Sequence, residues 1–573
     1  MQLDNKAKNT IKLSFQTWRI SVKSVCKSLM MGLLLSVATL IPSQVQAQNQ
    51  TKPAIVISIA NMDEQLKDVK YLLTASGYPE LNFIAKAAIK GYAEGVDFSR
   101  SAGVALYFEG ENTTPNVSGF IPVDDLEILL DSVAGIAEVE QGKDDAYTIT
   151  IPDGTEIHVE EKGGYALFGT KAELLKSLPA EPAKMLGDNP TKYNLAFTIR
   201  PQHVPQPLRD LALDTIKEGS MQTLDQLDED LQEAQRQNLK TQMRQFEMLL
   251  NDSESIMIGM TADADNKKLY SDVEFLAKAG SELAKKMEQT KATEPSRFTG
   301  FLMPNAAMNF NATGKIPESD GANYSTLLAE AKKAVIEKMN EEGELSDAEF
   351  EKVEELVEGV VDILDNTIKK GVVDAGMAAV LEGSDANLVG GMTVADPAKV
   401  EAAIKDLVPM LKERIGMPDN TDVPVIKFNL DAETHEGIRF HEINISIDDD
   451  DARELIGDSA SIAIGFGADS IYFGLGNGPM QLIKQGMAAK QKPEFDSEMN
   501  FRVAPFLKFL ARAPDSPEQL GVFAEQLTEN GGDLVRIYGK HIPNGSFSRF
   551  EMQGGILSLI KSAQDAYENA NDF

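Results

Sequence analysis

Histidine side chains are the residues of this chain best suited to acid–base or metal chemistry. No two of them have the spacing of an HExxH motif, in which histidines one helical turn apart bind zinc. His435 and His441 flank one arm of an expected hairpin, and each is followed by a Glu. This pair could hold a divalent cation at the surface. In a regular strand, however, His441 shares a face with Ile443, so a half-buried edge histidine is the simpler interpretation. The histidines are His158, His203, His435, His441 and His541.

A run of four acids, Asp448, Asp449, Asp450 and Asp451, is the second candidate for cation binding. Calcium prefers clustered carboxylates, but its strong sites space their ligands at alternate positions around a glycine turn. Acids that precede a helix over residues 452–456 are stabilised by the helix dipole, which explains the run more simply. These four acids, with His435 and His441, are weak candidates for a surface divalent cation, and no other cofactor is expected.

Other chemical motifs give no catalytic candidate. Residues 465–478 are rich in glycine but lack the Gly-Lys-Ser/Thr ending of a phosphate-binding loop, so tight turns are the expected role. No GxSxG motif occurs, and no Ser lies in a recognisable nucleophile setting. We therefore predict no catalytic residue, no cofactor-binding residue and no enzymatic activity, although a site assembled in space from distant residues stays an alternative.

The N-terminal residues 1–47 are expected to be a signal peptide. Six Lys and Arg residues form a basic leader, and residues 29–41 form an apolar run that is short for a membrane span. Val45 and Ala47 supply small residues at the two positions that signal peptidase reads, so cleavage after Ala47 is predicted. No twin arginine is present, which favours general secretion. The mature protein is then periplasmic or extracellular, with an uncleaved anchor as the alternative.

Cleavage would leave a strongly acidic chain. Lys and Arg fall from 55 to 49 and Asp and Glu from 89 to 88, so the net charge moves from −34 to −39. The single cysteine, Cys26, is lost with the leader, so the mature chain is cysteine-free and has no disulfides. The negative charge disfavours nucleic acids and anionic membranes as partners. No apolar run in the mature chain reaches the length of a transmembrane segment.

Short β-branched runs alternate with helical patterns along the mature chain. Asp63 and Asp124 are expected to cap two early helices. A long helical region is expected over about residues 208–250, with a break at Gly219. Alternating hairpins and helices, on strands too short and too polar for a parallel sheet, predict an α+β class with mainly antiparallel sheet and helices packed on one face.

Two stretches of the chain resemble each other. Residues 103–133 and 376–408 each read as a strand, a Glu-Gly turn, a second strand and an amphipathic helix. The order of the surrounding elements also matches, which predicts two duplicated domains over residues 54–288 and 298–570, joined by a polar linker at 289–297. The alternative to duplication is that any two α+β segments share short sequence similarities of this kind by chance. The sequence leaves open whether the two repeats pack together.

The basic leader, the acidic cysteine-free mature chain and the repeated layout resemble large uncharacterised secreted proteins of planctomycete bacteria. The resemblance is one of overall style and implies no functional residue. We expect a secreted structural or interaction protein, whose partner is an unknown protein or an apolar small molecule. The alternatives are a carrier of an apolar ligand in a cavity between sheet and helices, and an extracytoplasmic hydrolase.

Overall fold

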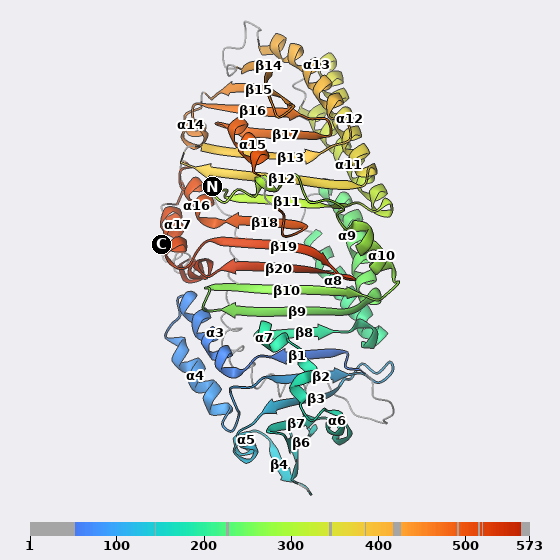
Figure 1. The fold of residues 1–573 in the computed structure, drawn as a ribbon, viewed down its shortest axis with the longest axis vertical. Coiled ribbons are helices and arrows are strands. Elements are labelled where there is room, and N and C mark those ends of the chain that lie inside the picture. The colour runs from blue at the N-terminus through green and yellow to red at the C-terminus, as the bar shows by residue number, and fades with distance from the viewer. Residues whose placement is uncertain are drawn as a thin grey trace. The chain divides into compact units, whose positions relative to one another are not determined.

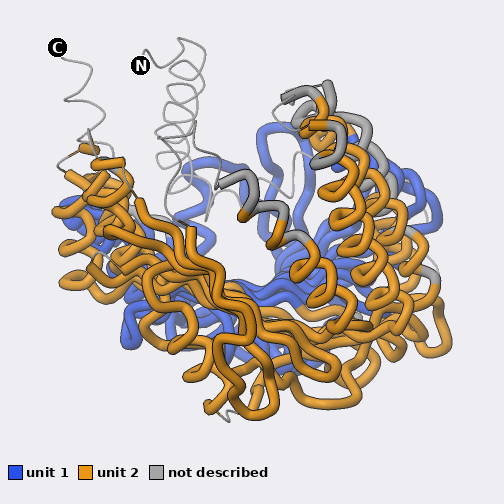
Figure 2. The backbone as a smooth tube through the Cα atoms, turned by 90° about the horizontal axis from the view of Figure 1, so that it is seen from above, with its two compact units in different colours: residues 1–217, 253–273 blue, residues 218–252, 274–573 orange. Residues whose placement is uncertain are grey.

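A computed structural model describes residues 52–143, 145–224, 229–342, 346–383, 385–415, 426–447, 449–489, 492–513, 516–517 and 519–562. The chain has 41% helix and 34% antiparallel strand, so it belongs to the α+β class. It divides into two compact units, which Figure 2 colours separately. Unit 1 comprises residues 1–217 and 253–273, and unit 2 comprises residues 218–252 and 274–573. Within the described ranges, no helix is long and apolar enough to cross a membrane.

Unit 1 is built on an antiparallel sheet whose first strand in the chain, β1, lies between β2 and β8. The strands follow the order β4-β5-β6-β7-β3-β2-β1-β8-β9-β10 (Figure 1). Helix α8 and strand β10 contribute only their first residues to this unit. Its elements are β1 Ile55–Ile59, α3 Met62–Ala75, α4 Leu81–Tyr92, β2 Ala102–Tyr107, β3 Asn116–Pro122, α5 Leu126–Val133, β4 Glu138–Gln141, β5 Ala146–Thr150, β6 Glu156–Lys162, β7 Tyr165–Gly169, α6 Ala172–Ser177, η2 Pro182–Leu186, α7 Asn189–Lys192, β8 Leu195–Ile199, η3 Pro201–His203, α8 Gln206–Leu224, β9 Ser253–Asp263 and β10 Lys268–Ala277.

Unit 2 has a sheet of the same strand order. It runs β14-β15-β16-β17-β13-β12-β11-β18-β19-β20, again with the first strand, β11, in the interior (Figure 1). Its elements are α9 Glu229–Asp252, α10 Glu282–Thr290, η4 Thr299–Phe301, β11 Met308–Lys315, α11 Glu318–Glu342, α12 Asp347–Lys369, β12 Val372–Glu382, β13 Asp385–Thr393, α13 Pro397–Ile415, β14 Ile426–His435, β15 Ile438–Ser446, α14 Asp450–Ile456, β16 Ser459–Phe466, β17 Ser470–Gly476, α15 Pro479–Ala488, β18 Ser497–Arg502, α16 Val503–Leu510, α17 Gln519–Glu529, β19 Leu534–Ile542 and β20 Gly545–Gln553.

Helices cover both faces of the unit 1 sheet, whereas the sequence led us to expect them on one face of each sheet. In unit 1, α5 packs Leu126 and Leu130 against Val104 and Phe168. On the opposite face, α6 and η2 pack Leu175 and Leu186 against Val56, Phe120 and Leu167. The expectation of one covered face is therefore wrong, because the central strands are apolar on both sides and each side needs a cover.

The sequence patterns predicted most helices correctly, but some of the predicted helix ends differ from those in the structure. Asn61, not Asp63, caps α3, and Asp125, not Asp124, caps α5, since it is their side chains that accept from the backbone amides of Glu64 and Ile128. Gly219 lies inside α8 rather than at a break, because its cost in a helix interior is only about 1 kcal/mol.

Candidate functional site

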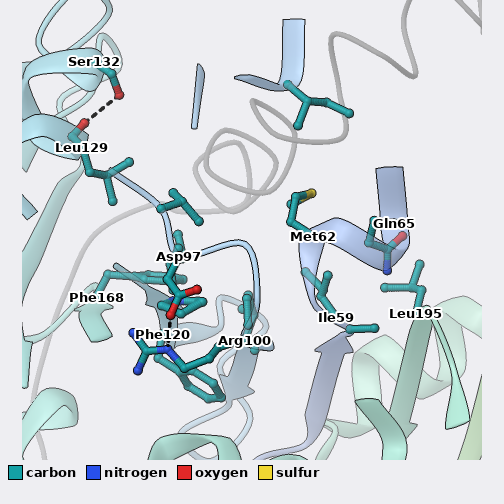
Figure 3. Close-up of a pocket in the computed structure, with 18 of the residues that line it drawn as sticks. Ile59, Met62, Gln65, Asp97, Arg100, Phe120, Leu129, Ser132, Phe168 and Leu195 are labelled. Atoms are coloured by element: carbon teal, nitrogen blue, oxygen red, sulfur yellow. Dashed lines mark hydrogen bonds and ion pairs between the residues drawn. The ribbon is translucent and has the colours of Figure 1, made fainter. Parts of the chain in front are cut away.

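Unit 1 contains a cavity of about 230 Å³ between helices α3, α4 and α5 and one face of the sheet (Figure 3). The sheet contributes Ile59 from β1, Ala102 and Val104 from β2, Phe168 from β7 and Leu195 from β8. Strand alternation and the pairing of Ile59 with both Ala102 and Leu195 put these side chains on one face. The wall on the sheet side is therefore hydrocarbon.

The helices close the other side of the cavity with similar side chains. Met62 and Val69 come from α3, Ile89 from α4, and Leu129 and Val133 from α5. Figure 3 shows Ile59, Met62, Gln65 and Leu195 on one side of the cavity and Phe168, Leu129 and Asp97 on the other. Apolar residues at helical spacing in α3 and α5 thus meet the apolar face of the strands, and the space between them is not filled.

The polar side chains that line the cavity use their hydrogen-bonding groups on other protein atoms. The amide of Gln65 donates to the carbonyl of Asn194, and the hydroxyl of Ser132 donates to the carbonyl of Leu129 at 2.7 Å. The guanidinium of Arg100 pairs with Asp97 and donates to the carbonyl of Gly164 at 2.6 Å. A ligand that enters the cavity therefore meets few free polar groups.

Asp97 and Arg100 form a fixed ion pair at the cavity wall. Ser99 donates its hydroxyl and its backbone amide to Asp97, and these bonds, with Arg100, hold the pKa of that carboxyl below its usual value. The Arg100 guanidinium also lies over the ring of Tyr165, 4.5 Å from its centroid. Asp97 neutralises the charge of Arg100, and these contacts fix the Arg100 side chain in the cavity wall.

A polar contact beneath α3 holds this helix on the sheet. The side chain of Asn194 donates to the carboxylate of Asp68 at 2.7 Å and accepts from the amide of Ala262 at 2.7 Å. Asp68 is buried on α3, and this burial raises the pKa of its carboxyl, with the bond from Asn194 acting in the opposite direction. The contact keeps Gln65 and Val69, on the same helix, at the edge of the cavity.

The size and lining of the cavity suit a small apolar ligand or one end of a hydrocarbon chain. An apolar cavity of about 150 Å³ is already large enough to stay dry and to bind benzene. Burial of hydrocarbon in such a space yields about 25 cal/mol for each Å² removed from water. The arrangement offers binding by shape and hydrophobic burial.

The structure places His441 in a buried group of charged residues rather than beside His435. Its Nε2 atom lies 3.2 Å from Oε1 of Glu401 on α13, and its Nδ1 atom accepts the backbone amide of Asp431 at 2.8 Å. Potential ligand atoms of Glu401, Asp431 and His441 all lie within 4.8 Å of one another. This is the closest approach to a metal-binding geometry that the predicted residues make.

The donor atoms of this group are already engaged, so they do not fit a metal ion. Glu401 accepts from Lys405 at 2.9 Å and from Arg439 at 2.6 Å, which neutralises its charge. With Nδ1 of His441 accepting an amide proton, Nε2 carries the hydrogen that faces Glu401. A cation at this point would meet an ammonium and a guanidinium, so the group is a buried ion-pair network.

Among the described residues, the remaining predicted metal candidates do not come together. Asp449 is the N-cap of α14 and accepts from the amide of Ala452 at 2.7 Å, while Asp450 pairs with Arg453 on the same helix. Asp450 and Asp451 lie in the first turn of α14, as the dipole interpretation expects, and Asp448 lies outside the described residues. His435 lies at the end of β14, with its Nε2 atom buried and without a hydrogen-bond partner.

A carboxylate, an imidazole and a hydroxyl also line up in unit 2. Nδ1 of His541 lies 2.8 Å from Oδ2 of Asp496, and Nε2 lies 3.2 Å from the hydroxyl of Thr290. This order of groups resembles a catalytic triad. The hydroxyl of Thr290, however, donates to the carbonyl of Met287 in its own helix at 3.1 Å. One proton cannot serve both acceptors, so the group is better explained as a clip between the end of α10 and β19.

Sequence reasoning missed the residues of the cavity. They come from several strands, three helices and the segment before β2, and none is of a chemically reactive type apart from the paired Asp97 and Arg100. The alternation of apolar residues in the strands predicts that helices cover one face of the sheet. It does not predict that a cavity remains between the helices and the sheet. Comparison with protein-family models, with curated proteins and with solved structures finds no match for this chain.

Proposed function

We propose that the protein is a non-enzymatic carrier and that unit 1 binds a small apolar ligand between its sheet and helices α3, α4 and α5. The observation that supports this function is the cavity of about 230 Å³, whose walls are hydrocarbon and whose polar side chains are engaged elsewhere. A pocket of this kind favours binding by burial.

Fluorescence titration with the neutral apolar dye N-phenyl-1-naphthylamine tests the proposal. Ala102 lines the cavity from β2, so Ala102→Phe fills part of the space. We expect this substitution to weaken dye binding at least tenfold, which corresponds to about 1.4 kcal/mol of lost burial. The matched control is Ala102→Ser, which leaves the volume nearly unchanged and should bind within about threefold of the natural protein.

Native mass spectrometry of protein purified from its source supplies an independent readout. A retained mass lost in Ala102→Phe supports the carrier. A clean ligand-free mass, together with dye binding that Ala102→Phe leaves intact while the protein stays folded, would rule the cavity out. The structural or interaction role expected from the sequence would then be the better explanation.

Residues 54–288 and 298–570, whose bounds differ from those of the two units, are further proposed to be duplicates of one ancestral domain. Their sheets share one strand order, and paired residues correspond across them. Val104 pairs with Gly119 in unit 1, and Met377 pairs with Gly390 at the same place in unit 2. Gly119 in turn faces Phe168, and Gly390 faces Phe473. This agreement in pairing supports duplication over a chance resemblance between short sequence segments.

Export by a general secretion signal is proposed from the leader. The expected result is that N-terminal sequencing of the protein from its natural source begins at Gln48, after cleavage behind Ala47. A sequence that begins at Met1 in protein recovered from the cytoplasm would contradict the proposal.

A further inference from the structure

One face of the unit 2 sheet has an uninterrupted row of apolar side chains across neighbouring strands. Directly paired residues of antiparallel strands point to the same side, so the pairing register defines the row. From β17 to β20 it crosses seven strands, and at about 4.8 Å between strands it is roughly 29 Å long. The row is Phe473, Gly390, Met377, Phe310, Met499, Ile537 and Phe550.

A second row runs beside the first and is equally apolar. Its members are Leu475, Leu388, Ala379, Met308, Phe501, Val535 and Met552. Several side chains in the two rows are open to solvent, with exposed fractions of 49% for Leu475, 40% for Ile537 and 42% for Phe550. The exposed side chains lie towards the two ends of the rows, and the side chains between them are partly buried. Apolar residues left uncovered across neighbouring strands are typical of an interaction or ligand-binding surface.

The opposite face of the same sheet is a closed core. Ala378, Val389 and Ala463 are fully buried there beneath η4 and α15. The apolar rows therefore do not belong to the core cluster of unit 2, although their strands are the same. Both faces of the sheet carry apolar residues. They differ in that η4 and α15 pack on one face, whereas several apolar side chains of the other stay exposed.

Helices stand at both ends of the strands that form the open face. Helices α11, α12 and α13 lie along one end of the strands, and α14, α16 and α17 lie along the other (Figure 1). Within unit 2, Glu401 of α13 contacts His441 and Phe506 of α16 contacts Phe501, and both sheet residues lie on the open face. These contacts place α13 and α16 against the side of the sheet that carries the apolar rows.

The correspondence with unit 1 indicates what kind of ligand fits this face. The first row occupies the same sheet positions as Phe168, Gly119, Val104, Ile57, Phe197 and Ile258 of unit 1. Phe168 and Val104 of that set line the cavity proposed to hold an apolar ligand. In unit 1, helices α3, α4 and α5 cover part of this surface, whereas Ile537 and Phe550 of the equivalent row in unit 2 are exposed.

We propose that the open face of unit 2 is a second binding site, for the unbranched hydrocarbon chain of a neutral lipid-like molecule. The inference rests on the proposed carrier function and extends it to a longer ligand. A linear row of roughly 29 Å across seven strands matches an extended chain better than a compact molecule. The net charge of −34 repels anionic headgroups, so the ligand is a neutral alcohol or ester rather than a carboxylate.

Direct binding of octanol, dodecanol and hexadecanol, measured by isothermal titration calorimetry, tests the second site. In the Ala102→Phe background, in which the unit 1 cavity is filled, we expect the affinity to rise about fourfold for each added methylene over this series. The double variant Leu475→Glu/Ile537→Glu should weaken hexadecanol binding at least tenfold. The matched control Leu211→Glu/Ile216→Glu changes two apolar residues with exposed fractions of 60% and 37% on α8, which belongs to neither proposed site, and should bind as the natural protein does.

The outcomes separate the two sites. Hexadecanol binding that Leu475→Glu/Ile537→Glu leaves unchanged overturns the second site, while dye binding sensitive to Ala102→Phe would still support the first. Long-chain binding lost in the double variant and retained in Ala102→Phe supports the second site even if the unit 1 proposal fails. If the double variant does not fold, Leu475→Thr/Ile537→Thr keeps the strand preference of both positions and is expected to show the same loss.

Light scattering provides the remaining control. A dimer in the natural protein that Leu475→Glu/Ile537→Glu converts to a monomer would show that a second copy of the chain covers the face, and would overturn the proposal. A monomer in both proteins, together with the chain-length dependence, supports it.

Discussion

Gly119→Ala is expected to destabilise unit 1 by about 3 kcal/mol, at the upper end of the usual cost of overpacking. A Cβ atom at this position would lie 2.3 Å from Cζ of Phe168 and 2.7 Å from the carbonyl oxygen of Gly103. The ring of Phe168 also lines the cavity and can shift towards it, but the carbonyl oxygen of Gly103 belongs to the backbone of β2 and is held by the sheet. Hydrogen exchange at the amides of β3 and the urea midpoint measure the effect.

Gly390→Ala should have a similar effect in unit 2, because its Cβ would lie 2.6 Å from Cζ of Phe473 and 2.7 Å from the carbonyl oxygen of Gly376. Gly359→Ala is the control, since nothing lies within 4 Å of its Cβ and alanine in a helix interior should stabilise by up to about 1 kcal/mol. Combining Gly119→Ala with Phe168→Leu should recover part of the loss. Stability at the natural level in both glycine variants would show that the rings move aside.

Glu401→Ala is expected to lower the free energy of unfolding of unit 2 by about 3 kcal/mol, as removal of one partner from a buried ion pair does. The Glu401 side chain is 6% exposed, and its loss leaves the imidazole of His441 without an acceptor and Arg439 without its partner. Glu401→Gln keeps an acceptor for His441 but removes the charge, so it should cost less. Urea denaturation at neutral pH measures both variants.

The same network predicts a pH dependence of stability. Burial alone would raise the pKa of Glu401, but Lys405, Arg439 and His441 outweigh burial and hold it below its ordinary value of 4.5. A carboxyl whose folded pKa is lowered stabilises the fold above its unfolded pKa and loses that contribution as the pH falls through the folded pKa. The stability difference between the natural protein and Glu401→Gln should therefore shrink as the pH falls below about 4.5. A difference that stays constant from neutral to acidic pH would contradict this assignment.

The sequence predicted the order of elements better than their register. In the sequence, residues 117–120 (VSGF) align with residues 389–392 (VGGM), which makes Gly391 the expected counterpart of Gly119, but the strand pairing equates Gly119 with Gly390. A slip of one residue reverses the face of every side chain in a strand, and the period of two looks the same either way until a partner strand is known. The sequence also matches the hairpin over residues 425–447 with the one over residues 147–160, which is β5 and β6, but β14 and β15 occupy the sheet positions of β4 and β5.

The candidate sites were even less predictable, for a different reason. His441 stood out because histidine is rare in this chain, yet its chemistry is set by Glu401, which lies on α13 among many ordinary acids. Residues of the cavity are common aliphatic types, and only packing shows that the space between α5 and the sheet is incompletely filled. Composition and periodicity describe which faces are apolar, whereas fit between those faces depends on the shapes of side chains from distant parts of the chain.

The interior position of β1 has a consequence for how the chain folds as it is made. During synthesis β1 can pair with β2 early. The other edge of β1 stays unpaired until β8 is synthesised, which follows β2 to β7, α5 and α6 in the chain. The same delay recurs with β11, which waits for β18. Such distant pairings slow folding because a long loop must close before the contact stabilises anything. Until then an apolar strand edge stays unpaired, so the nascent chain is open to aggregation and is a natural client for chaperones.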